Sequence, residues 1–232
     1  MGMRRSERSS VGEGLGVPVN ASPILWQAGR RGFALLEALL TIVILAFGLL
    51  GMLGMQGRMG AVGVEAFQRA QATLLVSDMA DRMSASPFAA CNSAAVTDAE
   101  RSACMANRLQ GYVTNSPLGT GDYQPADCSA MAIGAARDGC EWSNALKGSA
   151  ETTGAGGVGA MTGARGCIEQ LQAPDPSAGV CTPGIYRVSA VWQGLSPTAA
   201  PSIACGTGSY GSDEAYRRVI AARVSLALPL CK

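Results

Sequence analysis

Residues 30–57 read RRGFALLEALLTIVILAFGLLGMLGMQG, and this stretch decides the fold of the chain. Between positions 33 and 57 it contains one charged side chain, Glu37. As an α-helix these residues rise about 37 Å, which exceeds the roughly 30 Å hydrocarbon core of a bilayer. Two arginines open the stretch, and Arg58 is the first charge after it. Length and apolarity therefore predict one membrane-spanning helix, and the positive-inside rule predicts a cytoplasmic N-terminus and an exported C-terminal region.

The composition argues against most classes of enzyme. The 232 residues include no histidine, which excludes Ser-His-Asp and Cys-His catalysis and the HExxH zinc site. Residues 1–32 hold five arginines and two glutamates, for a net charge of +3, and the remainder carries −2. A chain this close to neutral lacks the basic surface that nucleic acid requires. We therefore predict a protein that is not an enzyme, with no catalytic residue, cofactor, metal or nucleic-acid partner.

The eight cysteines all follow the apolar stretch. None belongs to a CxxC pair, so neither a zinc ribbon nor a thioredoxin-like site is indicated. An even number of cysteines beyond a membrane-spanning helix indicates disulfides in an oxidising compartment, the alternative being buried free thiols. Eight cysteines allow many pairings, and the sequence alone does not choose among them. Pairing neighbours in sequence gives the working set Cys91–Cys104, Cys128–Cys140, Cys167–Cys181 and Cys205–Cys231.

Glu37 is out of place in an apolar segment. A carboxylate there costs about 2–3 kcal/mol on insertion scales, and such residues are usually functional. The alternative is a carboxylate close enough to the interface to reach water. The eight residues from Arg30 to Glu37, RRGFALLE, resemble the class III signal peptide of type IV prepilins and pseudopilins: a basic leader, then Gly, then Phe, then Glu at the fifth mature position. The resemblance implies cleavage between Gly32 and Phe33 by a prepilin peptidase, with N-methylation of Phe33.

Such cleavage gives Glu37 a physical role. It creates a cationic amine on Phe33, and that charge needs a partner inside an apolar helix bundle. A carboxylate one helical turn along, on the same or a neighbouring subunit, supplies one. In the pilin family this pairing aligns an incoming subunit with the growing fibre.

Six glycines recur at every third position from 48 to 63. In an α-helix each costs about 1 kcal/mol relative to alanine. Small residues allow close helix packing in a membrane or fibre core. Alternatively, the glycines loosen the helix so that it can extend after leaving the bilayer. A third interpretation is a general drift toward small residues in a chain with 30 glycines.

The remaining pattern predicts an α+β, type IV pilin-like fold. Residues 58–86 form an amphipathic stem that ends near Ser86-Pro87, with apolar positions at Val62, Ala66, Leu74, Leu75, Met79 and Met83. Residues 87–232 form a disulfide-rich periplasmic head, a small antiparallel sheet packed on the helix. Its predicted helices are Asp98–Leu109 and Asp138–Lys147, and its predicted strands are Gly166–Gln172, Ile185–Gln193 and Tyr216–Leu228. Tyr186 to Gln193 alternate in polarity, which predicts a half-buried strand.

Several segments resemble the PilV family of minor pilins, the type IV pilus modification proteins. They are GLLGMLGMQ after the motif, SDMADRMSASP at the end of the stem, EWSNALKG, YRVSAVWQG and YRRV. They cover the stem and the second half of the head, whereas residues 88–135 match nothing in the family and eight cysteines exceed its pattern. The resemblance implies a structural protein that helps initiate pilus assembly at or near the tip, in support of adhesion and twitching motility.

The same resemblance implies a set of partners and a location. Residues 1–32 are the leader peptide, and residues 33–57 lie in the lipid bilayer of the inner membrane and later in the fibre core. The implied partners are the prepilin peptidase, other minor pilins, the major pilin, the inner-membrane assembly platform and a tip adhesin. After assembly the protein belongs to the pilus on the cell surface.

Two other functions stay open at this point. A minor pseudopilin of a type II secretion system shares the N-terminal motif, although the large head favours the pilus. A membrane-anchored periplasmic enzyme or binding protein would draw on the scattered carboxylates of the head, which are Asp122, Asp127, Asp138, Glu141, Asp213 and Glu214. A calcium site would use Asp122 and Asp127, but their spacing falls short of an EF-hand loop.

Overall fold

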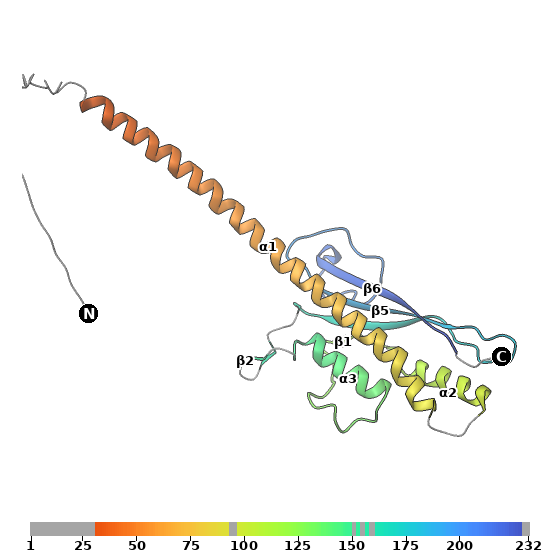
Figure 1. Ribbon diagram of the computed structural model, residues 1–232. Coiled ribbons are helices and arrows are strands. Elements are labelled where there is room, and N and C mark those ends of the chain that lie inside the picture. Colours follow the sequence, from red (N-terminus) through yellow and green to blue (C-terminus); the bar gives the residue numbers. More distant parts are fainter. Residues whose placement is uncertain (1–30, 93–96, 150–151, 154–155, 158–160, 229–232) are drawn as a thin grey trace, which may run out of the picture. The chain divides into compact units, whose positions relative to one another are not determined.

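The computed structural model describes residues 31–92, 97–149, 152–153, 156–157 and 161–228. The fold is α+β, with a long N-terminal apolar helix and a four-stranded antiparallel sheet (Figure 1). The chain divides into two compact units between Leu53 and Gly54. Nearly all of the predicted leader, residues 1–30, lies outside the described residues, and so does Cys231.

Helix α1, Arg31–Asn92, contains 62 residues and runs through both units. The prediction that it ends at Ser86-Pro87 is wrong, because the helix continues through the buried Pro87 to Asn92. Proline removes one helical hydrogen bond and normally breaks the helix. Here the last turn is held from outside, since Cys91 is buried and disulfide-bonded to Cys104 of helix α2, Asp98–Gln110.

In the second unit α1 buries one narrow stripe of side chains. Its members recur at intervals of three or four residues and are Gln68, Ala72, Val76, Met79, Met83, Pro87 and Cys91. The predicted stripe was partly wrong: Val62, Ala66 and Leu74 are exposed and lie off this line. Met79 and Met83 are fully buried as predicted. Gln68 is thus the first buried side chain of the stem, later along the helix than the sequence pattern suggested.

The main sheet has the strand order β1-β4-β5-β6, with every neighbouring pair antiparallel. Its strands are β1 Leu118–Gly119, β4 Arg165–Gln172, β5 Gly184–Gln193 and β6 Arg217–Leu226. The three long strands are those predicted, with ends displaced by at most two residues. A small hairpin pairs β2, Thr152–Thr153, with β3, Gly156–Gly157, and a short 3₁₀ helix, Glu214–Tyr216, precedes β6.

Helix α3, Ala135–Leu146, and the stem contribute to one core with the sheet. From β5 this core receives Tyr186, Val188, Ala190 and Trp192, the apolar half of the predicted alternation. The prediction of a half-buried strand is wrong for the second half of β5, where Ser189 and Val191 are buried as well. The reason is a second cluster on the other face, in which Cys205 and Tyr210 pack against Val191.

Candidate functional site

The predicted processing site lies at the start of α1. The described part of the helix, Arg31–Asn92, includes Gly32 and Phe33. Every residue from Ala34 to Gly57 is exposed. Within the part of the chain that the structure describes, α1 is the one helix long and apolar enough to span a membrane, with a mean hydropathy of 2.5 in its most apolar window. An apolar surface of this length needs an apolar medium, either lipid or other helices.

Glu37 lies four residues after Phe33, which places the two positions on one face of α1, one turn apart. The Glu37 side chain is exposed and forms no ion pair with any described residue. Its carboxylate is therefore available to a group outside the described chain. The amine that it would pair with arises only on cleavage after Gly32, so the roles of Gly32, Phe33 and Glu37 stay predictions.

The six periodic glycines lie within α1 and have unoccupied surroundings. A Cβ built at any of them, at positions 48, 51, 54, 57, 60 and 63, meets no described atom within 4 Å apart from its chain neighbours and the nearby backbone of α1 itself. Three residues turn an α-helix by about 300°, so successive glycines point about 60° apart and the six encircle the helix. They consequently form no single packing face. This arrangement favours the interpretation in which they loosen the helix.

The stem is fastened to the head by an arginine that sequence analysis did not single out. Arg82 on α1 donates to Asp78 at 2.9 Å and to Glu141 at 2.6 Å, and it lies 3.5 Å from Asp138. Burial alone would lower the Arg82 pKa, but the Glu141 and Asp78 carboxylates outweigh it and raise that pKa. Asp138 also accepts a hydrogen bond from the Tyr112 hydroxyl. Two of the carboxylates considered for catalysis thus bind the stem.

Two further contacts join the stem to the head. The indole Nε1 of the fully buried Trp142 donates to the Leu75 carbonyl oxygen at 2.8 Å. Arg218 of β6 forms an ion pair with Glu65 at 2.5 Å. No local spacing could have identified these partners, because they lie 67 and 153 residues apart. The contact between an α3 tryptophan and a helix carbonyl has no sequence signature at all.

The Asp122 carboxylate organises the loop after β1. Lys147 lies 2.5 Å from it, the Ser143 hydroxyl donates to it at 2.6 Å and the Gly119 amide donates at 2.8 Å. Burial alone would raise the Asp122 pKa, but these hydrogen bonds and one from the Gln124 amide outweigh it and lower that pKa. An ion-paired carboxylate with this many donors is held as a structural anion.

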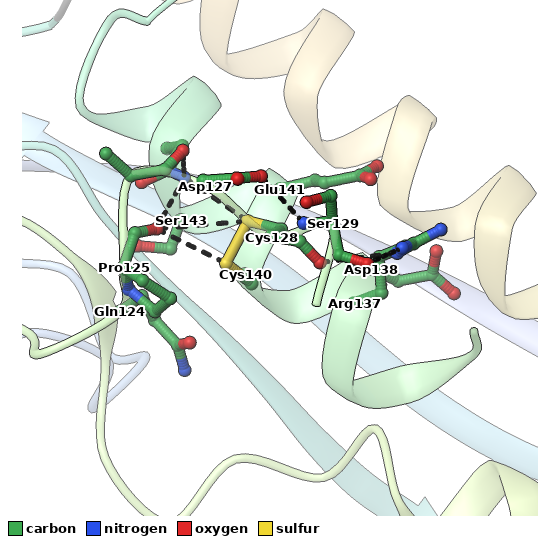
Figure 2. The surroundings of a disulfide bond; sticks show 12 residues. Gln124, Pro125, Asp127, Cys128, Ser129, Arg137, Asp138, Cys140, Glu141 and Ser143 are labelled. Carbon is green, nitrogen blue, oxygen red and sulfur yellow. Dashed lines mark hydrogen bonds between the residues drawn. A yellow bond between two sulfur atoms is a disulfide. The ribbon is translucent and has the colours of Figure 1, made fainter. Parts of the chain in front are cut away.

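Asp127 belongs to a neighbouring turn that Figure 2 shows beside a disulfide. Its carboxylate accepts a hydrogen bond from the Ser129 amide at 2.9 Å, which lowers the Asp127 pKa. Arg137 of α3 donates to the carbonyl oxygens of Cys128 and Ser129. The turn is therefore joined to α3 by the hydrogen bonds of the Arg137 side chain as well as by the Cys128–Cys140 disulfide. Asp127 and Asp122 serve separate turns, which does not favour the calcium site considered above.

The last two candidate carboxylates hold the segment before β6. Asp213 caps the 3₁₀ helix by accepting from the Ala215 amide at 2.9 Å. Glu214 accepts from the Gly208 amide at 2.7 Å, the largest cause of its lowered pKa, and pairs with Arg217. Arg217 is buried and also donates to the carbonyl oxygens of Pro201, Ile203 and Cys205. All six carboxylates therefore have structural partners.

The disulfides differ in part from the working set. The structure contains Cys91–Cys104 and Cys128–Cys140, two of the expected pairs. It also contains Cys167–Cys205, so the expected pairs Cys167–Cys181 and Cys205–Cys231 are wrong. Cys181 is disulfide-bonded as well, and none of the described cysteines is a free thiol.

The position of Cys181 explains the error. It lies in the turn between β4 and β5, next to the bridge between Asp175 and Thr182. Cys167 lies five residues back from the end of β4 at Gln172, which is about 17 Å of strand. A disulfide needs Cα atoms within about 7 Å, so the strand itself separates these neighbours in sequence.

The comparisons with known proteins leave the geometry as the main guide to function. Among the described residues, no three His, Cys, Asp or Glu side chains gather as metal ligands would. The chain matches no protein-family model, no curated protein and no solved structure.

Proposed function

We infer that the chain is a minor pilin, a structural component that helps initiate assembly of a type IV pilus at or near its tip. One observation carries this proposal. The RRGFALLE motif stands at the start of an uncovered apolar helix, and the same helix continues as the stem of a disulfide-bonded antiparallel head. Each part is compatible with a pilin, and their order along the chain is the order a pilin requires.

Under this proposal the motif directs processing and topology. A prepilin peptidase removes residues 1–32 and methylates the new N-terminus at Phe33. Before assembly the apolar half of α1 spans the inner membrane, with the head in the periplasm, where its cysteines oxidise. During assembly the same surface exchanges lipid for the helices of other minor pilins and the major pilin, at the inner-membrane platform.

The features of the head favour a subunit used a few times over one repeated along a shaft. The long connection between β5 and β6 is held against the head by the Cys167–Cys205 disulfide and by the buried Arg217. It is therefore a fixed part of the head and adds to its size. The periodic glycines weaken the helix on all sides, which a load-bearing shaft subunit would not tolerate. A subunit at or near the tip, in contact with a tip adhesin, need not have a small head or a helix strong enough to bear the load of a shaft.

The decisive experiment combines intact-mass analysis with quantification of sheared fibres. The mature chain is expected to start at methylated Phe33 and to occur in fibres far below the major subunit. Glu37→Ala is expected to leave membrane insertion intact and to reduce incorporation into fibres. Thr41→Ala, an exposed change one turn along the same helix, is the matched control and should leave incorporation unchanged.

Three outcomes would contradict the proposal. The first is a wild-type chain that keeps its leader, and the second is parity with the major subunit in purified fibres. The third is Glu37→Ala in fibres at the wild-type level. Presence of the chain in a type II secretion complex, with none in surface fibres, would instead favour the minor pseudopilin, which the shared N-terminal motif also allows.

A further inference from the structure

Strand β6, blue in Figure 1, forms an edge of the main sheet and pairs only with β5. Within the described residues, the backbone of residues 219–226 has no hydrogen-bond partner beyond β5. Alternate residues of an antiparallel strand turn their N–H and C=O groups outward. The outer side of β6 therefore presents a row of unpaired donors and acceptors, which is a template for another strand.

At the opposite edge of the sheet, the backbone of β4 has hydrogen-bond partners beyond β5. The short β1 pairs with the start of β4, at Arg165 and Gly166. Beyond it, the Thr114 amide donates to the Ile168 carbonyl oxygen at 3.0 Å, and the Ile168 amide donates to the Thr114 hydroxyl at 2.9 Å. The fold thus protects one edge with specific contacts and leaves the other open.

The charges along the open edge are unbalanced. β6 contains three arginines and no acidic residue. Arg217 and Arg218 have ion-pair partners, Glu214 and Glu65, whereas the exposed Arg223 has none among the described residues.

Arg223 also ends a line of charges that crosses the sheet. It lies directly opposite Arg187 of β5, and Arg187 lies opposite Glu169 of β4, with which it forms an ion pair. Like charges directly opposite each other destabilise a sheet. The order is therefore negative, positive, positive, and the single carboxylate already serves Arg187. An acidic residue on a strand added beyond β6 would complete the line beside Arg223.

The other face of the edge is apolar. Ile220, Ala222 and Val224 are only partly buried where they pack against the core. Alternate apolar side chains of an added strand would cover them, because side chains of neighbouring strands meet on the same face. A second copy of β6 fits poorly, since it would bring three more arginines and no carboxylate.

We propose that the edge formed by residues 219–226 binds an extended segment of another protein, which adds a strand to the sheet and places an aspartate or glutamate beside Arg223. The segment alternates apolar side chains toward Ile220 and Val224 with polar ones on the charged face. The inference does not depend on the pilin assignment, since it follows from the sheet alone.

The test uses the full chain in detergent micelles and synthetic nine-residue peptides of alternating valine and threonine. One peptide has glutamate at its central polar position, a second has lysine there, and a third is the glutamate peptide with N-methylated backbone amides. Binding is measured by fluorescence anisotropy of labelled peptide, and the location by hydrogen exchange. The glutamate peptide is expected to bind about fivefold more tightly than the lysine peptide and to slow amide exchange in residues 219–226. The N-methylated peptide should not bind.

Variants distinguish the edge from general attraction to a basic protein. Arg223→Glu should invert the preference, so that the lysine peptide binds more tightly. Arg108→Glu, the same change at an exposed arginine of α2, should leave the preference as in the wild type. The proposal is overturned if no peptide binds, because Arg223 then acts as a charge that blocks edge pairing. Equal binding of the two charged peptides, protection outside residues 219–226, or an unchanged preference in Arg223→Glu would overturn it too.

Discussion

Gly166 on β4 lies where any side chain would meet the ring of Trp142. A Cβ there would be 2.2 Å from Trp142 Cη2, 2.4 Å from Cζ3 and 2.8 Å from Leu146 Cδ1. Trp142 is fully buried and its Nε1 is engaged with the Leu75 carbonyl oxygen. The ring therefore cannot retreat from a new methyl group without disturbing the hydrogen bond that joins α3 to the stem.

The magnitude of Gly166→Ala follows from three contributions. Overpacking a buried site costs about 1–3 kcal/mol, and weakening the Trp142 hydrogen bond costs about 1 kcal/mol more. Replacing glycine with alanine in a strand returns about 0.5 kcal/mol of backbone entropy. The free energy of unfolding is expected to fall by about 1.5–3.5 kcal/mol in total, which is large against the stability of a single domain.

The assay is denaturant-induced unfolding of the full chain in detergent, followed by tryptophan fluorescence. The matched control is Gly139→Ala on α3, where a Cβ would lie at an ordinary 3.6 Å from Leu118 Cδ1. This control should stabilise the protein by up to about 1 kcal/mol, because alanine is the better helix former. In a Trp142→Phe background, which lacks the outer ring atoms, Gly166→Ala should cost at least about 1 kcal/mol less than in the wild type.

Two results would refute this reasoning about Gly166. One is a Gly166→Ala variant within about 0.5 kcal/mol of the wild type, the range of an ordinary surface substitution. The other is strict additivity of the Gly166 and Trp142 changes, which would mean that the two sites do not meet.

Further predictions concern the helix, the corrected disulfide and the loop carboxylate. Replacing Gly57, Gly60 and Gly63 with alanine should stabilise α1 locally by about 3 kcal/mol and slow amide exchange there. The opposite change, Ala61→Gly, should accelerate amide exchange. Equal exchange in all variants would contradict the interpretation that the glycines loosen the helix. Non-reducing peptide mapping should recover Cys167 joined to Cys205, and replacing both with serine should lower the free energy of unfolding by about 2–4 kcal/mol; a Cys167–Cys181 peptide would contradict the structure. The lowered pKa of Asp122 means that its contribution to stability is complete above the ordinary value of 3.8 and is lost as pH falls through the lower folded value. Asp122→Asn should remove that part of the acid dependence, and a stability profile identical to the wild type below pH 4 would count against the assignment.

Local patterns predicted more of this fold than long-range contacts did. The strands β4, β5 and β6 and the helices α2 and α3 followed from polarity and from start and stop signals within a few residues. The pairs Cys91–Cys104 and Cys128–Cys140 matched because short loops bring sequence neighbours together. Each of these features depends on interactions within about a dozen residues, which is the range that periodicity reports.

The errors share a different physical cause. α1 passes Pro87 because a disulfide and a buried cluster hold its last turn, and neither is visible in the helical pattern. The contacts of Arg82, Trp142 and Arg218 depend on tertiary placement. At the processing site the motif names Gly32, Phe33 and Glu37, but the pairing that it predicts requires a cleaved N-terminus. Strand order and helix packing decide where α1 ends and which residues contact the stem, and both are properties of the whole chain.

The single helix α1 also has a mechanical consequence. A pull on its apolar end loads the stem contacts in sequence, first Glu65 with Arg218, then the Leu75 carbonyl with Trp142, then Arg82 with its carboxylates. Beyond these noncovalent contacts the force reaches Cys91, where a covalent bond to α2 stops further peeling. Tension that strips the stem from the sheet therefore leaves the end of α1 joined to α2 through the Cys91–Cys104 disulfide.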